Sequence, residues 1–356
     1  MPHGEVSHAA ASASPSPGAA YATRIDNAPT VLGSIVPLDD AATALTSEAN
    51  AHDSRNILAK LRAYLLSLPK AVASRLIDEF LNKKQDALTK LPFTIQKNGL
   101  LSAAPTLRVF LLDLLEQIDP KAASQYALQI LATPGSPDEW AISLRNYALG
   151  GSPLATQAFL EQKLQEMLAN SAWRTDPSVG YLEAFDTAVY THDTALTPAL
   201  SQLMANKDDR AVAHAAYLTL DRLVLSDPAA VLSQLAAQPD LMQGHELTRA
   251  DYFARADPSD PQQKALLESY LLDPNRSQQE LNTFAGLYPN ENYMISNNLL
   301  TQTQTPTYTD IVARERSALS AVQGWMSDPR FQALQPQLQT MSNRLQMFVG
   351  QAAAGQ

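Results

Sequence analysis

Asp-Pro dipeptides recur along this 356-residue chain, and they constrain its fold more than any other feature of the sequence. An aspartate before a helix accepts hydrogen bonds from the free N–H groups of the first turn and faces the positive end of the helix dipole. Proline then fits the first helical position, where its missing N–H would be unpaired anyway. Most of the seven dipeptides stand just before a stretch with helical apolar spacing. Their aspartates are Asp119, Asp176, Asp227, Asp257, Asp260, Asp273 and Asp328. The pattern predicts an all-helical chain whose helices are started one by one.

The composition agrees with helix-on-helix packing. Hydrophobic residues make up 45% of the chain and aromatic residues only 7%, so alanine and leucine must carry most of the burial. Alanine, leucine and glutamine favour helices, and glycine is rare outside junctions. There is no cysteine, which excludes disulfides, thiolate catalysis and cysteine-based zinc or iron–sulfur sites.

The net charge of −10 is unevenly placed. Residues 1–50 hold one arginine against five acids, residues 51–150 hold twelve lysines and arginines against nine acids, and residues 151–356 hold thirteen against twenty-two. Nucleic-acid binding requires clustered cations along one face, so the acidic majority argues against a nucleic-acid partner. No run approaches the roughly 20 apolar residues of a membrane span.

Residues 1–50 are rich in alanine, serine and proline, and we expect a largely disordered tether there. The apolar segment Val31 to Leu38 is the part that can dock on the body as an extended piece. The start of the chain lacks the pattern of a signal peptide, and a tether that follows a removed leader or anchor is a hypothesis. On that basis the sequence favours a periplasmic or cell-envelope location over a cytoplasmic one. Residues 350–356 are expected to form a disordered tail.

Helical periodicity begins at Asn56 and continues to residue 349. Leu58, Leu61 and Leu65 lie on one helix face, and Pro69 ends that helix. The next apolar face follows at once, so the two helices read as an αα-hairpin. Residues 51–349 are therefore predicted to be a helical-array domain.

One β-like signal interrupts the helices, at residues 93–101. Thr94 and Ile95 precede Asn98-Gly99, and Leu100 and Leu101 follow. Asn-Gly favours a two-residue type I′ turn, so we predict a short β-hairpin.

Two helix starts have a serine cap with glutamate three residues later. They are Ser136 with Glu139, and Ser277 with Glu280. In such a start the glutamate can bond back to the N–H of the cap residue.

The sequence resembles the helical-pair repeat proteins, and HEAT repeats are the closest in unit length and in their Pro/Asp helix starts. The resemblance lies in these starts and in the apolar spacing after them, over roughly residues 52–349. It implies an irregular HEAT-like α-solenoid, in which each unit packs on its neighbours and the array exposes a long surface. The Asp-Pro intervals are irregular and show no shared period. A compact, irregular helical domain is the rival architecture.

The search for catalytic motifs yields no site, so no catalytic residue, metal ligand or cofactor is predicted. His245-Glu246 begins like a His-Glu-x-x-His zinc motif, but Arg249 stands where the second histidine is needed. Ser67 and Lys70 match Ser-x-x-Lys, but Pro69 intervenes and Ser67 ends a helix.

Two surfaces are candidates for binding. Residues 287–310 form a long stretch rich in tyrosine and asparagine, which are adaptable contact residues. Its predicted partner-binding residues are Tyr288, Asn290, Tyr293, Asn297 and Tyr308. The alternative is a structured connection packed by its tyrosines.

The last helix carries apolar residues at alternating spacings of three and four, as in a coiled-coil seam. They are Phe331, Leu334, Leu338, Met341, Leu345 and Phe348. We expect this seam to pack on the preceding helix, with self-association as the alternative.

These observations favour a non-enzymatic module that binds unidentified protein partners through the surface of a helical array. The alternatives are a self-associating structural component and an accessory subunit of an enzyme with a pocket between helices.

Overall fold

A computed structural model of the chain describes residues 37–47, 50–151, 153–206, 209–303 and 305–354. Over these residues the fold is all-α, with one small antiparallel sheet of two strands. The predicted fold class is confirmed. None of the helices in these ranges is both long and apolar enough to cross a bilayer.

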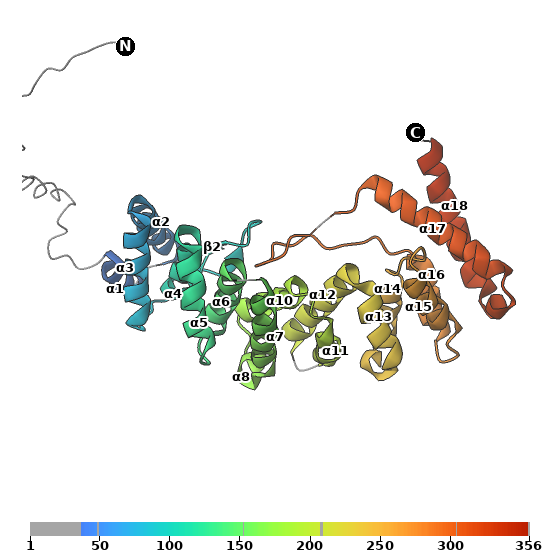
Figure 1. Cartoon of the computed structure of the whole chain (residues 1–356), viewed down its shortest axis with the longest axis horizontal. Coiled ribbons are helices and arrows are strands. Elements are labelled where there is room, and N and C mark those ends of the chain that lie inside the picture. The colour runs from blue at the N-terminus through green and yellow to red at the C-terminus, as the bar shows by residue number, and fades with distance from the viewer. Residues whose placement is uncertain (1–36, 48–49, 152, 207–208, 304, 355–356) are drawn as a thin grey trace, which may run out of the picture.

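The helices follow one another along a row that runs from α1 to α18 (Figure 1). In the first half lie α1 (Pro37–Thr46), α2 (Ala51–Ser67), α3 (Lys70–Asn82), β1 (Thr94–Ile95), β2 (Leu101–Ala103), α4 (Leu107–Ile118), α5 (Pro120–Leu131), α6 (Pro137–Gly150), α7 (Pro153–Ala169), α8 (Ser171–Thr175), α9 (Val179–Glu183) and α10 (Asp186–Tyr190). In the second half lie α11 (Thr197–Met204), α12 (Arg210–Ser226), α13 (Pro228–Ala237), α14 (Glu246–Phe253), α15 (Pro261–Leu272), α16 (Gln278–Leu287), α17 (Tyr308–Ser327) and α18 (Gln335–Ala354). Short 3-10 turns precede α11, α14 and α18.

Successive helices form two layers. One layer contains α4, α6, α9 with α10, α12, α14 and α16, and we call these the inner helices. The other contains α5, α7, α11, α13 and α15, and α5 packs on α6, α11 on α12 and α13 on α15. Most alternate helices of the chain thus share a layer.

The capping prediction is confirmed for four of the seven aspartates that precede a proline. Asp119, Asp227 and Asp260 accept the N–H of the third helical residue, with proline at the start of the helix. Asp328 caps the 3-10 turn at Pro329–Leu334 and accepts the N–H of its second residue, Arg330.

The other three Asp-Pro dipeptides do not cap a helix, so for them the prediction is wrong. Asp176 and Asp273 end α8 and α15, and Asp257 accepts the N–H of Ser259 in a turn. An aspartate can bond to the backbone two residues on, so the same side chain also forms turns. Ser178 and Ser277 then cap the next helices.

The β-hairpin is confirmed, but its turn is not the predicted type. Thr94 pairs with Ala103 and Ile95 with Leu101, with an irregularity between them. Gly99 has a φ of +78°, whereas Asn98 is not among the residues with positive φ, and type I′ needs positive φ at both positions. Gly99 donates its N–H to the Gln96 carbonyl at 3.0 Å, so the loop has three residues and ends in a left-handed glycine.

The two segments predicted to be disordered, residues 1–50 and 350–356, both include residues that are helical in the structure. The helix α1 lies inside the segment assigned to the tether, and it buries Leu38, Ala41 and Leu45. Leu38 is helical rather than extended, because it follows Pro37 at the first position of α1. Residues 1–36, which hold most of the expected tether, lie outside the described residues. The helix α18 continues to Ala354, where a tail was expected.

The C-terminal seam packs inside the chain, as its preferred interpretation states. Four of its six residues are completely buried, and Leu334 and Phe348 are half-buried. The helix α18 packs on α17 and α16. The fully buried residues are Phe331, Leu338, Met341 and Leu345.

Candidate functional site

Three Asp–Arg ion pairs connect neighbouring inner helices, and we call them the Asp–Arg pairs. Asp113 of α4 meets Arg145 of α6 at 2.7 Å. Asp186 of α10 meets Arg222 of α12 at 2.8 Å. The third pair joins Asp221 of α12 to Arg255, just after α14, at 2.8 Å. The aspartates are buried, so each carboxylate needs a cation and further donors to offset the loss of water.

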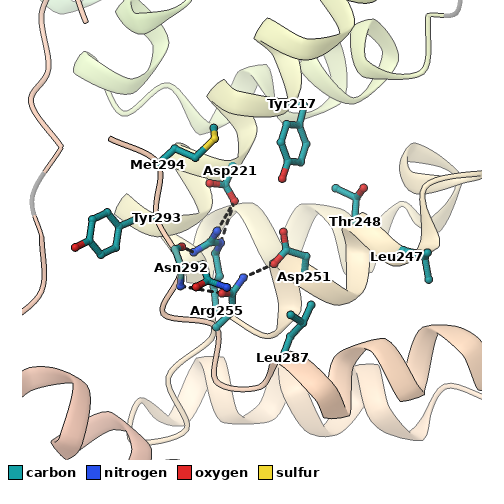
Figure 2. Close-up of a pocket in the computed structure, with 11 residues that line it drawn as sticks. Tyr217, Asp221, Leu247, Thr248, Asp251, Arg255, Leu287, Asn292, Tyr293 and Met294 are labelled. Atoms are coloured by element: carbon teal, nitrogen blue, oxygen red, sulfur yellow. Dashed lines mark hydrogen bonds and ion pairs between the residues drawn. The ribbon is translucent and has the colours of Figure 1, made fainter. Parts of the chain in front are cut away.

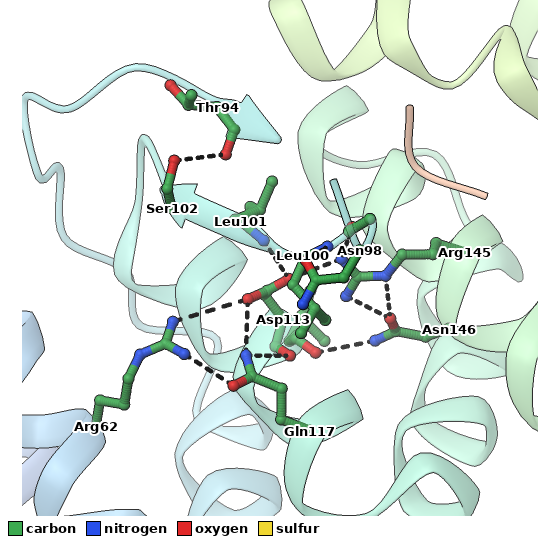
Figure 3. A network of polar contacts seen from close by, with 12 residues as sticks. Arg62, Thr94, Asn98, Leu100, Leu101, Ser102, Asp113, Gln117, Arg145 and Asn146 are labelled. Carbon is green, nitrogen blue, oxygen red and sulfur yellow. Dashed lines mark hydrogen bonds and ion pairs between the residues drawn. The ribbon is translucent and has the colours of Figure 1, made fainter. Parts of the chain in front are cut away.

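The first Asp–Arg pair holds the β-hairpin (Figure 3). Asp113 accepts the N–H of Leu101 at 2.9 Å, and Arg145 donates to the Gly99 carbonyl at 2.8 Å. Asn146 accepts two further hydrogen bonds from the Arg145 guanidinium. One ion pair therefore binds both a main-chain donor and a main-chain acceptor of the β-hairpin.

The second pair holds a distant part of the chain in a similar way. Asp186 accepts the N–H groups of Leu300 and Thr301 at 2.7 and 3.0 Å. It also accepts the Thr301 hydroxyl at 2.5 Å, and Arg222 donates to that hydroxyl oxygen. Two adjacent N–H groups on one carboxylate are charge-assisted hydrogen bonds, which are stronger than neutral ones.

The third pair binds the same segment closer to α16. Arg255 donates to the Asn292 carbonyl at 2.6 Å and to Asp221 at 2.9 Å (Figure 2). Asn290 donates its N–H to the Ala254 carbonyl at 2.8 Å. Both contacts again use main-chain atoms.

The segment held by the second and third pairs is residues 288–303, which we call the strap loop. It leaves α16, runs back over α14 and α12 toward α10 and the β-hairpin, and the chain then returns to α17 (Figure 1). At its tip the Asn297 amide donates to the Ile95 carbonyl at 3.0 Å, across 202 residues of sequence. A methyl group added to Gly99 would come within 2.4 Å of the Leu299 carbonyl oxygen, so glycine permits this close approach.

A cavity of about 440 Å³ opens between α12, α14 and the strap loop (Figure 2). Asp221 and Asp251 face it, with Arg255 between them, and Tyr217 and Tyr293 also line it. Burial raises the pKa of Asp221 to about 6, although the Arg255 charge opposes this. Burial also raises the pKa of Asp251. Arg255 binds Asp221 and the Asn290 amide binds Asp251, so both carboxylates already have partners.

The five predicted partner-binding residues separate into two groups. Tyr288 and Asn290 are buried, and the Tyr288 ring packs between Phe284 and Trp325. Tyr293 is half-buried, whereas Asn297 and Tyr308 are exposed. The strap loop brings the first four together along one path, but Tyr308 already belongs to α17. Tyr288 therefore fits the alternative interpretation, in which tyrosines pack a structured connection. Binding of a partner remains a prediction for the exposed residues.

Sequence reasoning missed the buried ion pairs of the inner helices. Glu139 and Glu280 do not bond back to their serine caps; they form two-contact ion pairs with Arg108 and Arg249 instead. In both cases arginine precedes glutamate by 31 residues. The Asp–Arg pairs recur similarly, with separations of 32 and 34 residues for the first and third. An arginine–acid search near this spacing would have found these ion pairs, which the Asp-Pro intervals do not show.

None of the groups of His, Asp and Glu in the described ranges has the arrangement of a metal site. Comparison with protein-family models, curated proteins and solved structures gives no match.

Proposed function

We propose that this protein is a non-enzymatic interaction module that binds other proteins along its inner helices. The main support is the chemistry of the Asp–Arg pairs. Each pair bonds to main-chain atoms of a non-helical segment, and main-chain groups are the part that every polypeptide shares. The proposal includes a HEAT-like solenoid architecture, in which a row of helix pairs offers a long continuous surface.

The strap loop provides the rim of this surface. Met294 and Ile295 are 49% and 78% exposed, next to the half-buried Tyr293. Exposed apolar side chains beside a polar groove are typical of protein contact surfaces.

Site-specific photocrosslinking tests the proposal. A photoreactive amino acid replaces Ile295 in one variant and Leu128 in another, because Leu128 is an exposed apolar residue of the outer helix α5. We expect discrete adducts with the same proteins of the source cells from position 295, and none of these from position 128. Equal adducts from both positions, or none from position 295, would overturn the proposal.

The two alternative functions have weaker support. An enzyme subunit with a pocket between helices needs free titratable groups, and both carboxylates of the 440 Å³ cavity are already bonded. Self-association through the C-terminal seam needs an exposed apolar stripe, but its central residues Leu338 and Met341 are buried within the chain.

A further inference from the structure

The strap loop has the properties of a bound ligand. It contains little regular structure, and its order comes from contacts with the Asp–Arg pairs and with the β-hairpin. From Asn292 to Thr303 it has no charged side chain. The aspartates and arginines beneath it neutralise one another in pairs, so the face they form matches an uncharged segment.

Most of the hydrogen bonds that anchor the strap loop use its main chain, while Leu299 adds a buried apolar side chain. Asp186 takes two adjacent N–H groups, Arg255 takes a carbonyl, and Gly99 lies against the Leu299 carbonyl. Thr301, Asn290 and Asn297 add side-chain hydrogen bonds to the inner helices and the β-hairpin. At the start of the loop, Glu291 also pairs with Arg314 of α17 at 3.2 Å. Another segment with the same backbone path and uncharged side chains can therefore make most of these contacts.

We infer that this face of the inner helices binds an uncharged, non-helical segment of a partner protein that turns where Asp186 holds it, and that the strap loop is the chain's own occupant of that site. This inference rests on the proposed function and names the kind of partner. The tethered loop competes at an effective concentration in the millimolar range. A partner must therefore displace it through additional contacts, for which Met294 and Ile295 are exposed nearby.

A peptide-binding experiment tests the inference. In the strap-free variant, Gly and Ser replace residues 292–303 at the same length, and Tyr288, Asn290 and Glu291 are kept. The probe is a fluorescent synthetic peptide with the sequence of residues 292–303, and binding is followed by anisotropy. We expect saturable binding to the strap-free variant and at least tenfold weaker binding to the intact protein.

Peptide variants locate the contact without changing the protein. Leu300→Pro and Thr301→Pro each remove an N–H that Asp186 accepts, and we expect at least a tenfold loss of affinity. Ile295→Ser is the matched control, because this side chain is 78% exposed, and we expect unchanged affinity. Equal affinity for all three peptides would overturn the inference.

A second variant keeps the test decisive if the strap-free chain does not fold, as judged by circular dichroism. Thr301→Pro in the full chain removes one N–H and the hydroxyl at the tip but leaves the receiving face intact. We expect this variant to bind the probe at least tenfold more tightly than the intact protein. The absence of binding to every folded variant would overturn the inference, and adducts at position 295 would then still support the proposed function.

A displayed library of random twelve-residue peptides identifies the class of occupant. We expect the strap-free variant, but not the intact protein, to enrich uncharged sequences. Enrichment of charged sequences would overturn the inference. So would exchange of strap loops between intact chains to form a dimer, because the occupant would then be a second copy of this chain.

Discussion

Glu116 of α4 gives the sharpest test of the energetics, because it is a buried acid whose charge is poorly compensated. It is 8% exposed, and its Oε2 has no hydrogen-bond partner among the described residues. Burial raises its pKa to about 7 from an ordinary value of 4.5; the charge of Asp113 adds to this and that of Arg145 opposes it. The folded chain therefore holds this proton more tightly than the unfolded chain does.

The sign of the pH dependence follows from this difference. Below pH 4.5 both states are protonated, and the free energy of unfolding receives no penalty from this group. Between pH 4.5 and 7 the unfolded chain loses the proton first, so the free energy of unfolding falls as pH rises. Above pH 7 the loss of unfolding free energy levels off at about 3 kcal/mol, because each unit of difference between the two pKa values corresponds to about 1.4 kcal/mol.

The substitution Glu116→Gln removes this penalty while it keeps the shape of the side chain. We expect the variant to be more stable than the parent by up to about 3 kcal/mol at pH 8, and to lie within about 1 kcal/mol of it at pH 4.5. Urea unfolding followed by circular dichroism at both pH values measures the difference. Glu79→Gln is the matched control, since Glu79 is an exposed glutamate of α3 and should show no such pH-dependent gain. A Glu116→Gln variant that is no more stable than the parent at pH 8 would refute the reasoning.

Three further substitutions test the fold and the site. Gly99→Ala should speed hydrogen exchange of residues 297–301, because its methyl group meets the strap loop. Gly244→Ala is the control, because Gly244 has the same φ of +78° but open space around it, and it should leave this exchange unchanged. Equal exchange in both variants would contradict the proposed close approach. Asp227→Ala should lower the stability by about 1 kcal/mol through loss of a helix cap, whereas Asp176→Ala, at the end of α8, should cost much less; thermal unfolding of the two variants compares them. Leu338→Asp should destabilise the packing of α18 by several kcal/mol, because it places a charge at a fully buried position. The mass measured by light scattering should not change. A parent dimer that dissociates on this substitution would show instead that the seam joins two chains.

The sequence predicts most helices because their signals are local. An apolar face such as that of Leu58, Leu61 and Leu65 lies within one helix, and a cap such as Asp119 contacts its own first turn. These interactions form largely irrespective of what the rest of the chain does. The same local chemistry is ambiguous where aspartate can form either a cap or a turn, and Asp273 is an example, because it accepts the N–H of Asn275 in a turn.

The candidate site could not be predicted in the same way, because its contacts join residues far apart in the chain. Arg145 and Asp113 meet only after two helices have packed, and either residue alone looks like an ordinary helix charge. The tyrosines and asparagines of residues 287–310 make this stretch a candidate contact segment, and binding there remains a prediction. Its path was not predictable, since a hydrogen bond such as that from Asn297 to Ile95 depends on the completed array.

The strap loop also has a mechanical consequence. In a row of helices whose members touch only their neighbours, small rotations at each interface add up, and the row bends easily. The strap loop connects α16 to Asp186 and to the β-hairpin, so it links parts of the row that lie several helices apart in the chain. Release of the loop would make the row more compliant, and a bound protein would then meet a surface whose curvature it can adjust.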